Sequence, residues 1–318
     1  MQCLLRWWGI LVPLLLLLTS ACTRKERIQL ETTALKVTAP PNTLRIADNF
    51  YADQTEVTNR AYREYLSWLA RVYGKTSARY RQARPDTSVL AEEVYLGEPY
   101  RGSYFSHPAY DHHPIVGLTG AQARAYSIWR TDRVAEQILL EAGWIRSAGT
   151  LDSNRVFTRE RYLRGGYDWI IRHQALALPS YAIPTVAEWE QLAGRDSGWR
   201  YGTDSLSRYN RKIQRWRGCL YHLGEGIYSR GTKGNPGLEW MPSRVDLLSK
   251  NVYGLHGVIG NVAELVAGGA VVKGGSWRQA LAVVDIPRND AFVKPTFWIG
   301  FRNVCRWEWV QPRVAPSD

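Results

Sequence analysis

The segment from Lys273 to Arg306 reads KGGSWRQALAVVDIPRNDAFVKPTFWIGFRNVCR, and glycine stands close to an aromatic residue near both of its ends. The first such motif is KGGSW (273–277) and the second is IGFR (299–302). Neither a helix pattern nor a Lys-Ser/Thr pair follows the glycines of the first motif, so they do not form a phosphate-binding loop. They predict a turn that lets Trp277 enter the core. The segment as a whole predicts a hairpin that holds out a long irregular loop.

The composition predicts a globular protein. The chain has 318 residues, of which 45% are hydrophobic, and it contains 14 Trp and 18 Tyr. Such a chain can form one large or two small hydrophobic cores. No cluster of cysteine or histidine has the spacing of a zinc site.

The N-terminal stretch MQCLLRWWGILVPLLLLLTSAC predicts a secretory leader. Its apolar run is short and contains Pro13, which argues against a membrane-spanning helix. Small residues precede Cys22, so we interpret residues 1–21 as a lipoprotein signal peptide and Cys22 as the lipidated first residue. A plainly cleaved signal is the alternative. The polar residues 22–45 predict a tether, and because no acidic run follows Cys22 we expect the periplasmic face of an outer membrane.

The net charge of the chain points to acidic or anionic partners. The formal charge is +12 at pH 7, and basic residues recur in 71–84 and 208–217. Nucleic acid is implausible for a secreted lipoprotein, so acidic protein surfaces, lipid headgroups or peptidoglycan are the expected partners. A merely solvated basic face is the alternative for either run taken alone.

Removal of the leader leaves three cysteines, Cys22, Cys219 and Cys305. In an oxidising compartment Cys219 and Cys305 could form a disulfide. Two buried thiols are the alternative.

Three stretches predict helices. The first helix is expected to begin at Thr58 or Asn59 and the second at Thr119, where the side chain can cap the first turn. Thr185 and Glu188 have the spacing of a capping box at the start of the third. The positions predicted to face the core are Tyr62, Tyr65, Leu66, Leu69, Val72 and Tyr73 in the first helix, Ala121, Ala125, Ile128 and Trp129 in the second, and Trp189 and Leu192 in the third.

The rest of the chain has little helical or strand pattern. Long segments rich in Tyr, Arg, Gly and Pro separate the helices, and short strand patterns with glycine turns follow Asn251. We therefore predict an α+β fold with low regular secondary structure and long loops. Residues 46–318 are expected to form a single domain with insertions near 74–112, 131–180 and 199–249.

Six motifs follow one another along the chain. They are DQTEVTNRAYREYL (53–66), HPIVGLTGAQARAYSIWRT (113–131), YAIPTVAEWEQLAG (181–194), NVYGLHGVIGNVAELV (251–266), VKGGSW (272–277) and GFR (300–302). In these motifs and their order the chain resembles the formylglycine-generating-enzyme (sulfatase-modifying factor) domain family. The resemblance implies a C-type-lectin-like variant of an α+β fold.

The lipoprotein leader occurs together with DQTEVTN (53–59), Trp-Arg-Thr (129–131) and GNVAELV (260–266). In this combination the chain resembles, within that family, the gliding-motility and type IX secretion lipoproteins of Bacteroidota, of GldK, PorK and GldJ type. This resemblance implies a structural role without catalysis, in oligomeric ring-like assemblies with a periplasmic protein partner beneath the outer membrane.

The resemblance also implies an oxidase chemistry, and the sequence lacks its ligands. That chemistry needs two cysteines between GGSW and GFR, because soft thiolates bind Cu(I), and residues 278–298 contain none. We therefore predict no catalytic residue. The loop residues expected to contact a partner instead are Asp285, Arg288, Asn289, Asp290 and Lys294.

Other chemistry is also hard to find in the sequence. No histidine pair has helical metal spacing. Glu56 follows a strand pattern, Glu188 is used in capping, and we expect Glu190 to face solvent, so paired carboxylates for acid–base catalysis are missing.

A structural calcium is the one cofactor that the resemblance implies for the residues present. Its ligands would be the side chains of Asn261 and Glu264 and the carbonyl of Val262, since calcium takes hard oxygen ligands. A hydrogen bond from the GGSW turn to Glu264 is the alternative. For the whole protein, the alternatives are a lectin-like ligand-binding lipoprotein and, third, an oxidase or nonheme-metal enzyme of the same fold.

Overall fold

The computed structural model describes residues 39–91, 102–146, 153, 155–167, 176–194, 241–248, 250–279 and 286–311, together with four short strands between 209 and 228. The chain divides into two units, 1–38 and 39–318, and all described residues lie in the second. Among those residues no helix is both long and apolar enough to cross a bilayer. Cys22 and most of the predicted tether lie outside the described residues.

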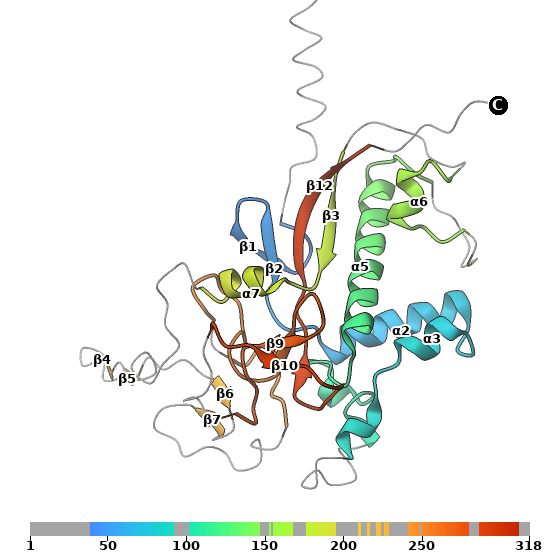
Figure 1. Ribbon diagram of the computed structural model, residues 1–318. Helices are drawn as coiled ribbons and strands as arrows, with labels where there is room; N and C mark the ends of the chain where they lie inside the picture. Colours follow the sequence, from blue (N-terminus) through green and yellow to red (C-terminus); the bar gives the residue numbers. More distant parts are fainter. Residues whose placement is uncertain are drawn as a thin grey trace, which may run out of the picture. The chain divides into compact units, whose positions relative to one another are not determined.

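The first sheet joins the two ends of the second unit (Figure 1). All its strands are antiparallel, in the order β1-β2-β12-β3. The longest pairing runs from Val304 opposite Ala182 to Val310 opposite Leu176. The strands are β1 (Thr43–Ala47), β2 (Phe50–Asp53), β3 (Leu176–Ala182) and β12 (Val304–Val310).

The second sheet is built from strands between residues 263 and 300, and the motifs KGGSW and IGFR begin at the end of β9 and in β11. Its order is β10-β9-β8-β11, in which β11 is parallel to β8 and the other pairs are antiparallel. These strands are β8 (Ala263–Leu265), β9 (Val271–Lys273), β10 (Asp290–Ala291) and β11 (Ile299–Gly300). Two separate hairpins pair β4 (Tyr209–Asn210) with β5 (Arg215–Trp216) and β6 (Tyr221–Leu223) with β7 (Gly226–Tyr228).

Helix α2 (Asn59–Tyr73) begins where the sequence predicts. The Thr58 hydroxyl caps it by accepting a hydrogen bond from the Ala61 amide at 3.2 Å. Most of the predicted core positions, at spacings of three and four residues, are buried. Leu66 and Tyr73 are only partly buried. The helix is followed by α3 (Ala78–Ala83), η1 (Thr87–Leu90) and η2 (Pro108–Tyr110).

Helix α5 (Gly120–Glu141) begins with a capping box of Thr119 and Gln122, but the prediction of its buried face is wrong. Ala121 and Ala125 are exposed, Ile128 is 56% exposed, and Trp129 is half-buried. The observed buried positions are Ala123, Tyr126, Ser127, Thr131, Ala135 and Leu139.

Packing against other elements explains which face of α5 is buried. Tyr126 stacks on Tyr62 of α2 with ring centroids 5.6 Å apart. The Thr131 hydroxyl accepts a hydrogen bond from the Tyr181 amide in β3 at 2.8 Å. The helix therefore lies along β3, and the face that carries Tyr126 and Thr131 is turned inward (Figure 1).

Helix α7 (Val186–Leu192) confirms the third predicted helix. Thr185 and Glu188 form the capping box, and Trp189 and Leu192 are fully buried. Glu190 corrects our prediction, because its side chain is buried and not solvent-facing. The short helix α6 (Arg159–Leu163) completes the helices of the described chain.

The buried side chains form several clusters around the two sheets. One lies between α7 and the first sheet and includes Phe50, Trp189 and Val304. Another joins α2 and α5 to the second sheet, where Tyr126 meets Phe301 edge-on at 5.5 Å. Short strands, few helices and long connections confirm the predicted α+β class with modest regular secondary structure.

Candidate functional site

The turn after β9 requires glycine. Gly274 and Gly275 have φ of +89° and +69°, in the left-handed region. A Cβ on Gly274 would lie 2.5 Å from the Val258 carbonyl oxygen. The turn directs Trp277 into the core, where the side chain is 4% exposed and its amide donates to the Asn261 carbonyl at 2.9 Å. The predicted role of the glycine pair as a turn is confirmed.

A buried lysine holds the far end of the loop that follows this turn. Lys273 is 1% exposed, and its ammonium donates to Glu190 Oε1 at 3.0 Å, Ile286 O at 2.6 Å and Asn289 Oδ1 at 3.1 Å. A buried ammonium needs such partners, because an isolated charge is costly away from water. This pairing is the physical reason that Glu190 is buried.

The predicted contact residues of the loop divide into two groups. Asn289 bonds to Lys273, and Asp290 accepts from Arg288 at 2.8 Å and from Gln279 at 2.9 Å, so Asn289 and Asp290 stabilise the loop itself. Arg288 and Lys294 are exposed. Asp285 lies outside the described residues. The described loop therefore presents basic side chains on a frame fixed from within.

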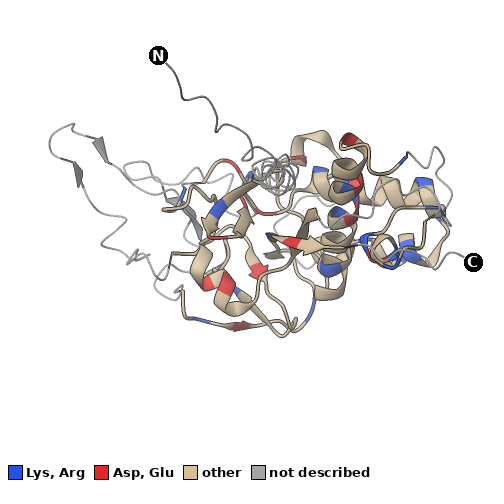
Figure 2. Cartoon of the chain, turned by 90° about the horizontal axis from the view of Figure 1, so that it is seen from above, with Lys and Arg blue, Asp and Glu red and all other residues tan. Residues whose placement is uncertain are grey.

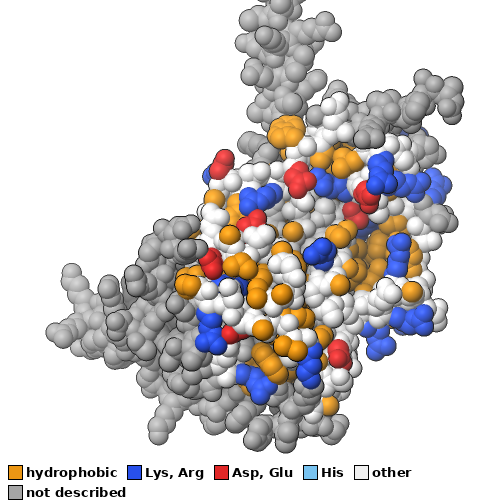
Figure 3. All heavy atoms as spheres, in the orientation of Figure 1, with side chains coloured by type: hydrophobic (Ala, Val, Ile, Leu, Met, Phe, Trp, Pro, Cys, Tyr) orange, Lys and Arg blue, Asp and Glu red, His pale blue; other side chains and the backbone are white. Residues whose placement is uncertain are grey.

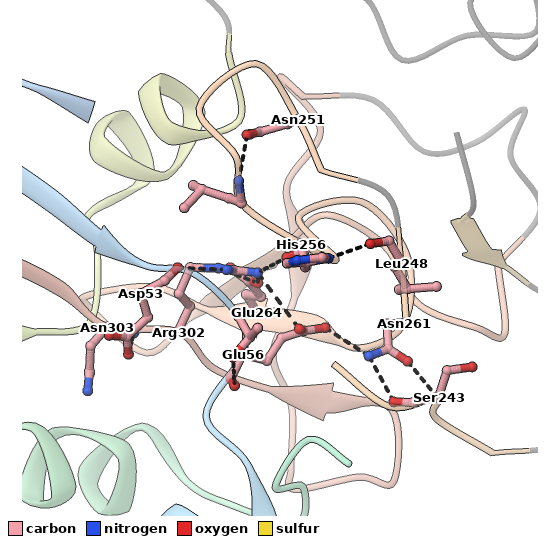
Figure 4. Close-up of polar contacts among 12 residues, drawn as sticks. Asp53, Glu56, Ser243, Leu248, Asn251, His256, Asn261, Glu264, Arg302 and Asn303 are labelled. Carbon is pink, nitrogen blue, oxygen red and sulfur yellow. Dashed lines mark hydrogen bonds and ion pairs between the residues drawn. The ribbon is translucent and has the colours of Figure 1, made fainter. Parts of the chain in front are cut away.

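Arg302, from the GFR motif, is completely buried, and its planar guanidinium is held by several hydrogen bonds (Figure 4). Its Nε and Nη2 both donate to Glu264 Oε1, at 3.0 and 2.8 Å. Nη1 donates to the Asp53 carbonyl at 2.9 Å, and Nη2 also donates to the His256 carbonyl at 2.6 Å. One side chain thus joins β2, β8 and the loop before it.

Glu56 lies beside this ion pair as a second buried carboxyl group (Figure 4). Its Oε1 accepts from Asn261 Nδ2 at 2.9 Å, whereas Oε2 lies 3.9 Å from Arg302 and has no hydrogen bond to described residues. Burial raises the pKa of Glu56 to about 8, although Arg302 opposes the shift. Burial therefore favours the protonated form of Glu56, whereas Arg302 and Glu264 form the ion pair.

The residues implied for calcium do not fit that ion. Both oxygens of Glu264 accept hydrogen bonds, from Arg302 and from the Trp189 indole at 2.7 Å, and Asn261 Oδ1 accepts from the Ser243 amide at 2.8 Å. The positively charged guanidinium of Arg302 lies against Glu264 and would repel a calcium ion bound there. In the described part of the chain no group of three or more His, Cys, Asp or Glu side chains is arranged to hold a metal.

The cysteine pairing stays a prediction. Cys219 lies outside the described residues. Cys305 is 1% exposed in β12, packed with Tyr51 and Tyr181. Burial raises the pKa of the Cys305 thiol to about 12, so the group is a weak nucleophile.

One of the two basic segments is described. Arg71, Lys75, Arg79, Arg81 and Arg84 are all exposed along α2 and α3. Figure 2 shows basic positions on several helices and loops of the second unit. Only the backbone of short strands is described within 208–217, so the second predicted basic segment remains a prediction.

Two parts of this arrangement are not predicted by the sequence. The first is the place of Glu56 in a buried network, where it accepts a hydrogen bond from Asn261, 205 positions away. The second is the exposure of the apolar face of α5, which its pattern predicts to lie in the core. No local signal separates these outcomes, because each depends on which distant element packs nearby.

Comparison with known proteins gives one strong match and several distant ones. The sulfatase-modifying factor enzyme 1-like domain model matches residues 19–307. A search of curated proteins found no match. Similar solved structures include Treponema denticola variable protein 1, with 17% identity over 81% of this chain and 84% of that chain and a TM-score of 0.38.

Two further structures have comparable similarity. CarF has 18% identity over 81% of this chain and 86% of its own, with a TM-score of 0.41. PvdO from Pseudomonas aeruginosa has 15% identity over 81% of this chain and 80% of its own, with a TM-score of 0.42. The residues matched by the family model include all six motifs, from 53 to 302. The chain belongs to the sulfatase-modifying factor enzyme 1-like domain family.

Proposed function

We propose that this member of the family is a non-catalytic, lipid-anchored subunit of a type IX secretion or gliding-motility apparatus that binds a periplasmic protein partner. One observation carries the proposal. Positions 278–298 contain no cysteine, whereas the oxidase chemistry of the family needs two thiolates there. The described loop is held by Lys273 and Asp290 and presents Arg288 and Lys294 outward. A fixed basic projection suits contact with a partner better than turnover.

Two further features support a subunit held at a membrane. The leader with Cys22 predicts a lipid anchor of more than one acyl chain, which would attach the protein stably. The charge of +12 favours association with acidic surfaces, because opposite potentials steer encounter and select partners.

Affinity purification from membranes, followed by mass spectrometry, tests the proposal. We expect the full chain to retrieve a secretion or motility component, and the double variant Arg288→Glu/Lys294→Glu to retrieve less of it. Leu247→Glu, at a side chain 48% exposed, is the matched control outside the loop. Recovery of the full chain only as a monomer would contradict the structural role. Stoichiometric copper or iron in the purified protein would contradict the non-catalytic assignment.

A further inference from the structure

The exposed face of α5 carries an apolar stripe whose side chains are spaced about one helical turn apart. Ala121, Ala125 and Ile128 follow one another at spacings of four and three residues, so they lie on one face. All three are exposed, and Arg124 is exposed among them. The sequence pattern predicts these apolar side chains to be buried, yet the second unit leaves them exposed to solvent. Exposed apolar side chains that are grouped together indicate a surface for association.

Two hollows lie on either side of this stripe and share its three residues. The smaller, about 420 Å³, extends to Ile183 and to Gly268–Gly269 in the turn before β9. The larger, about 630 Å³, lies between α5, α2 and α3. Figure 3 shows hydrophobic side chains gathered beside α5 and above α2, with basic side chains around them. The stripe is therefore a ridge between two depressions that can accept side chains of another molecule.

Aromatic rings line the larger hollow. Trp129 packs against Tyr65 at 5.1 Å and against Trp68 at 6.2 Å between ring centroids. Arg133 lies over the Trp68 ring at 4.7 Å, and Tyr73 also lines the hollow. Rings fixed by one another lose little conformational freedom when they receive an apolar side chain, which is the property of interface hot spots.

The rim of both hollows is basic. Arg124 lines the smaller hollow and Arg79 the larger. Arg81 and Arg84 are exposed and flank Gln82 and Ala83, which line the larger hollow. Asp132 is the acidic residue in the lining of the larger hollow, and one of its oxygens already accepts from the Arg159 amide at 2.8 Å. The charge of this surface therefore complements an acidic surface.

We propose that this α5 face, defined by Ala121, Arg124, Ala125 and Ile128 and the two hollows beside it, binds an acidic protein partner through a bulky apolar side chain in the larger hollow. The inference rests on the proposed partner-binding function and adds a second contact surface to the loop that presents Arg288 and Lys294. A second copy of this chain is disfavoured, because two copies of this strongly basic chain repel each other.

Site-specific photo-crosslinking in cells tests the surface with the full lipidated chain. A benzoylphenylalanine replaces Ile128 in one variant and Leu247 in the control. We expect a protein adduct at Ile128 whose cross-linked segment, mapped by mass spectrometry, has a net negative charge and an apolar side chain. Charge reversal by Arg79→Glu and Arg124→Glu together should lower the adduct yield by about tenfold or more, since like charges oppose docking. High salt should lower it too.

Several results would overturn the surface. They are an adduct with a second copy of this chain, an adduct with a glycan, a segment without net negative charge, or a yield at Ile128 no greater than at Leu247. Thermal melting of each variant shows whether it is folded, and substitutions at these exposed positions should leave the melting temperature close to that of the native chain. If affinity purification still retrieves a secretion component while Ile128 forms no adduct, the surface is wrong and the proposed function stands.

Discussion

Arg302 and Glu264 form a fully buried ion pair in which two guanidinium nitrogens donate to the same carboxylate oxygen. Both side chains are inaccessible to solvent. The third guanidinium nitrogen, Nη1, donates to the backbone carbonyl of Asp53 in β2. The pair connects the GFR motif to the GNVAELV motif across 38 positions. The pair holds two parts of the second unit together, so its removal should lower the free energy of unfolding.

Replacement of Arg302 by alanine should destabilise the protein strongly. The substitution leaves Glu264 buried without its counter-ion, which costs about 3–5 kcal/mol of unfolding free energy. Chemical denaturation checks this value. The control is Arg60→Ala, which removes an ion pair with Glu64 whose side chains are 62% and 63% exposed. That change should cost at most about 1 kcal/mol, and equal losses for the two variants would contradict the assigned role of Arg302.

Glu56 should make stability depend on pH. Its folded pKa is raised to about 8 from an ordinary value of 4.5, so between these values the folded protein holds a proton that the unfolded chain releases. The free energy of unfolding attributable to Glu56 therefore falls as pH rises through this window. Glu56→Gln should be more stable relative to the native chain at pH 9 than at pH 5, as followed by thermal melting.

The control for this experiment is Glu64→Gln, at an exposed carboxylate on α2. Its melting curves give the reference for the loss of a carboxyl group from the surface. Parallel melting curves for the native chain and Glu56→Gln across the whole pH range would show that Glu56 does not keep its proton in the fold.

Gly274→Ala should lower the free energy of unfolding for two reasons, backbone strain and a steric clash. A substitution at Gly268 measures the first of these alone. At Gly274 the backbone is left-handed, and the new Cβ would lie 2.5 Å from the Val258 carbonyl oxygen. Gly268 also has a positive φ, of +97°, but open space surrounds its Cβ position. Gly268→Ala should cost about 1–2 kcal/mol from the backbone alone. If Gly274→Ala lowers the free energy of unfolding by no more than Gly268→Ala does, the turn can move away from Val258.

Lys273 should stabilise the loop through its pairing with Glu190. Lys273→Met removes the ammonium from a buried carboxylate, at a cost of about 3–5 kcal/mol. Lys273→Met/Glu190→Gln removes both charges and should lose less than the single variant. A double-mutant cycle by denaturation measures the coupling. Additive losses from the two single changes would indicate that Lys273 and Glu190 act independently.

Local features of the fold were predictable from sequence because their hydrogen bonds join neighbouring residues. Thr58, Thr119 and Thr185 each cap a helix by accepting from a backbone amide three positions later. The turn at Gly274 was likewise evident, since only glycine adopts that backbone readily.

The buried face of α5 could not be predicted in the same way. Its sequence has apolar residues on two faces, and neither face is dominant by periodicity alone. Tyr126 is buried because Tyr62 of α2 stacks on it, and Ile128 is exposed on the opposite side. Burial here follows from the partner available on each side of the helix.

The family motifs, the positions of the helix caps and the absence of cysteine from 278–298 follow from the order of residues alone. Three other features become evident only in the folded chain: Glu56 lies beside Arg302, Glu190 is buried against Lys273, and one particular face of α5 is exposed to solvent. The two kinds of feature differ in the sequence separation of the residues that interact. Caps and turns are formed within a few residues of chain, whereas charge burial and face selection depend on elements brought together by folding.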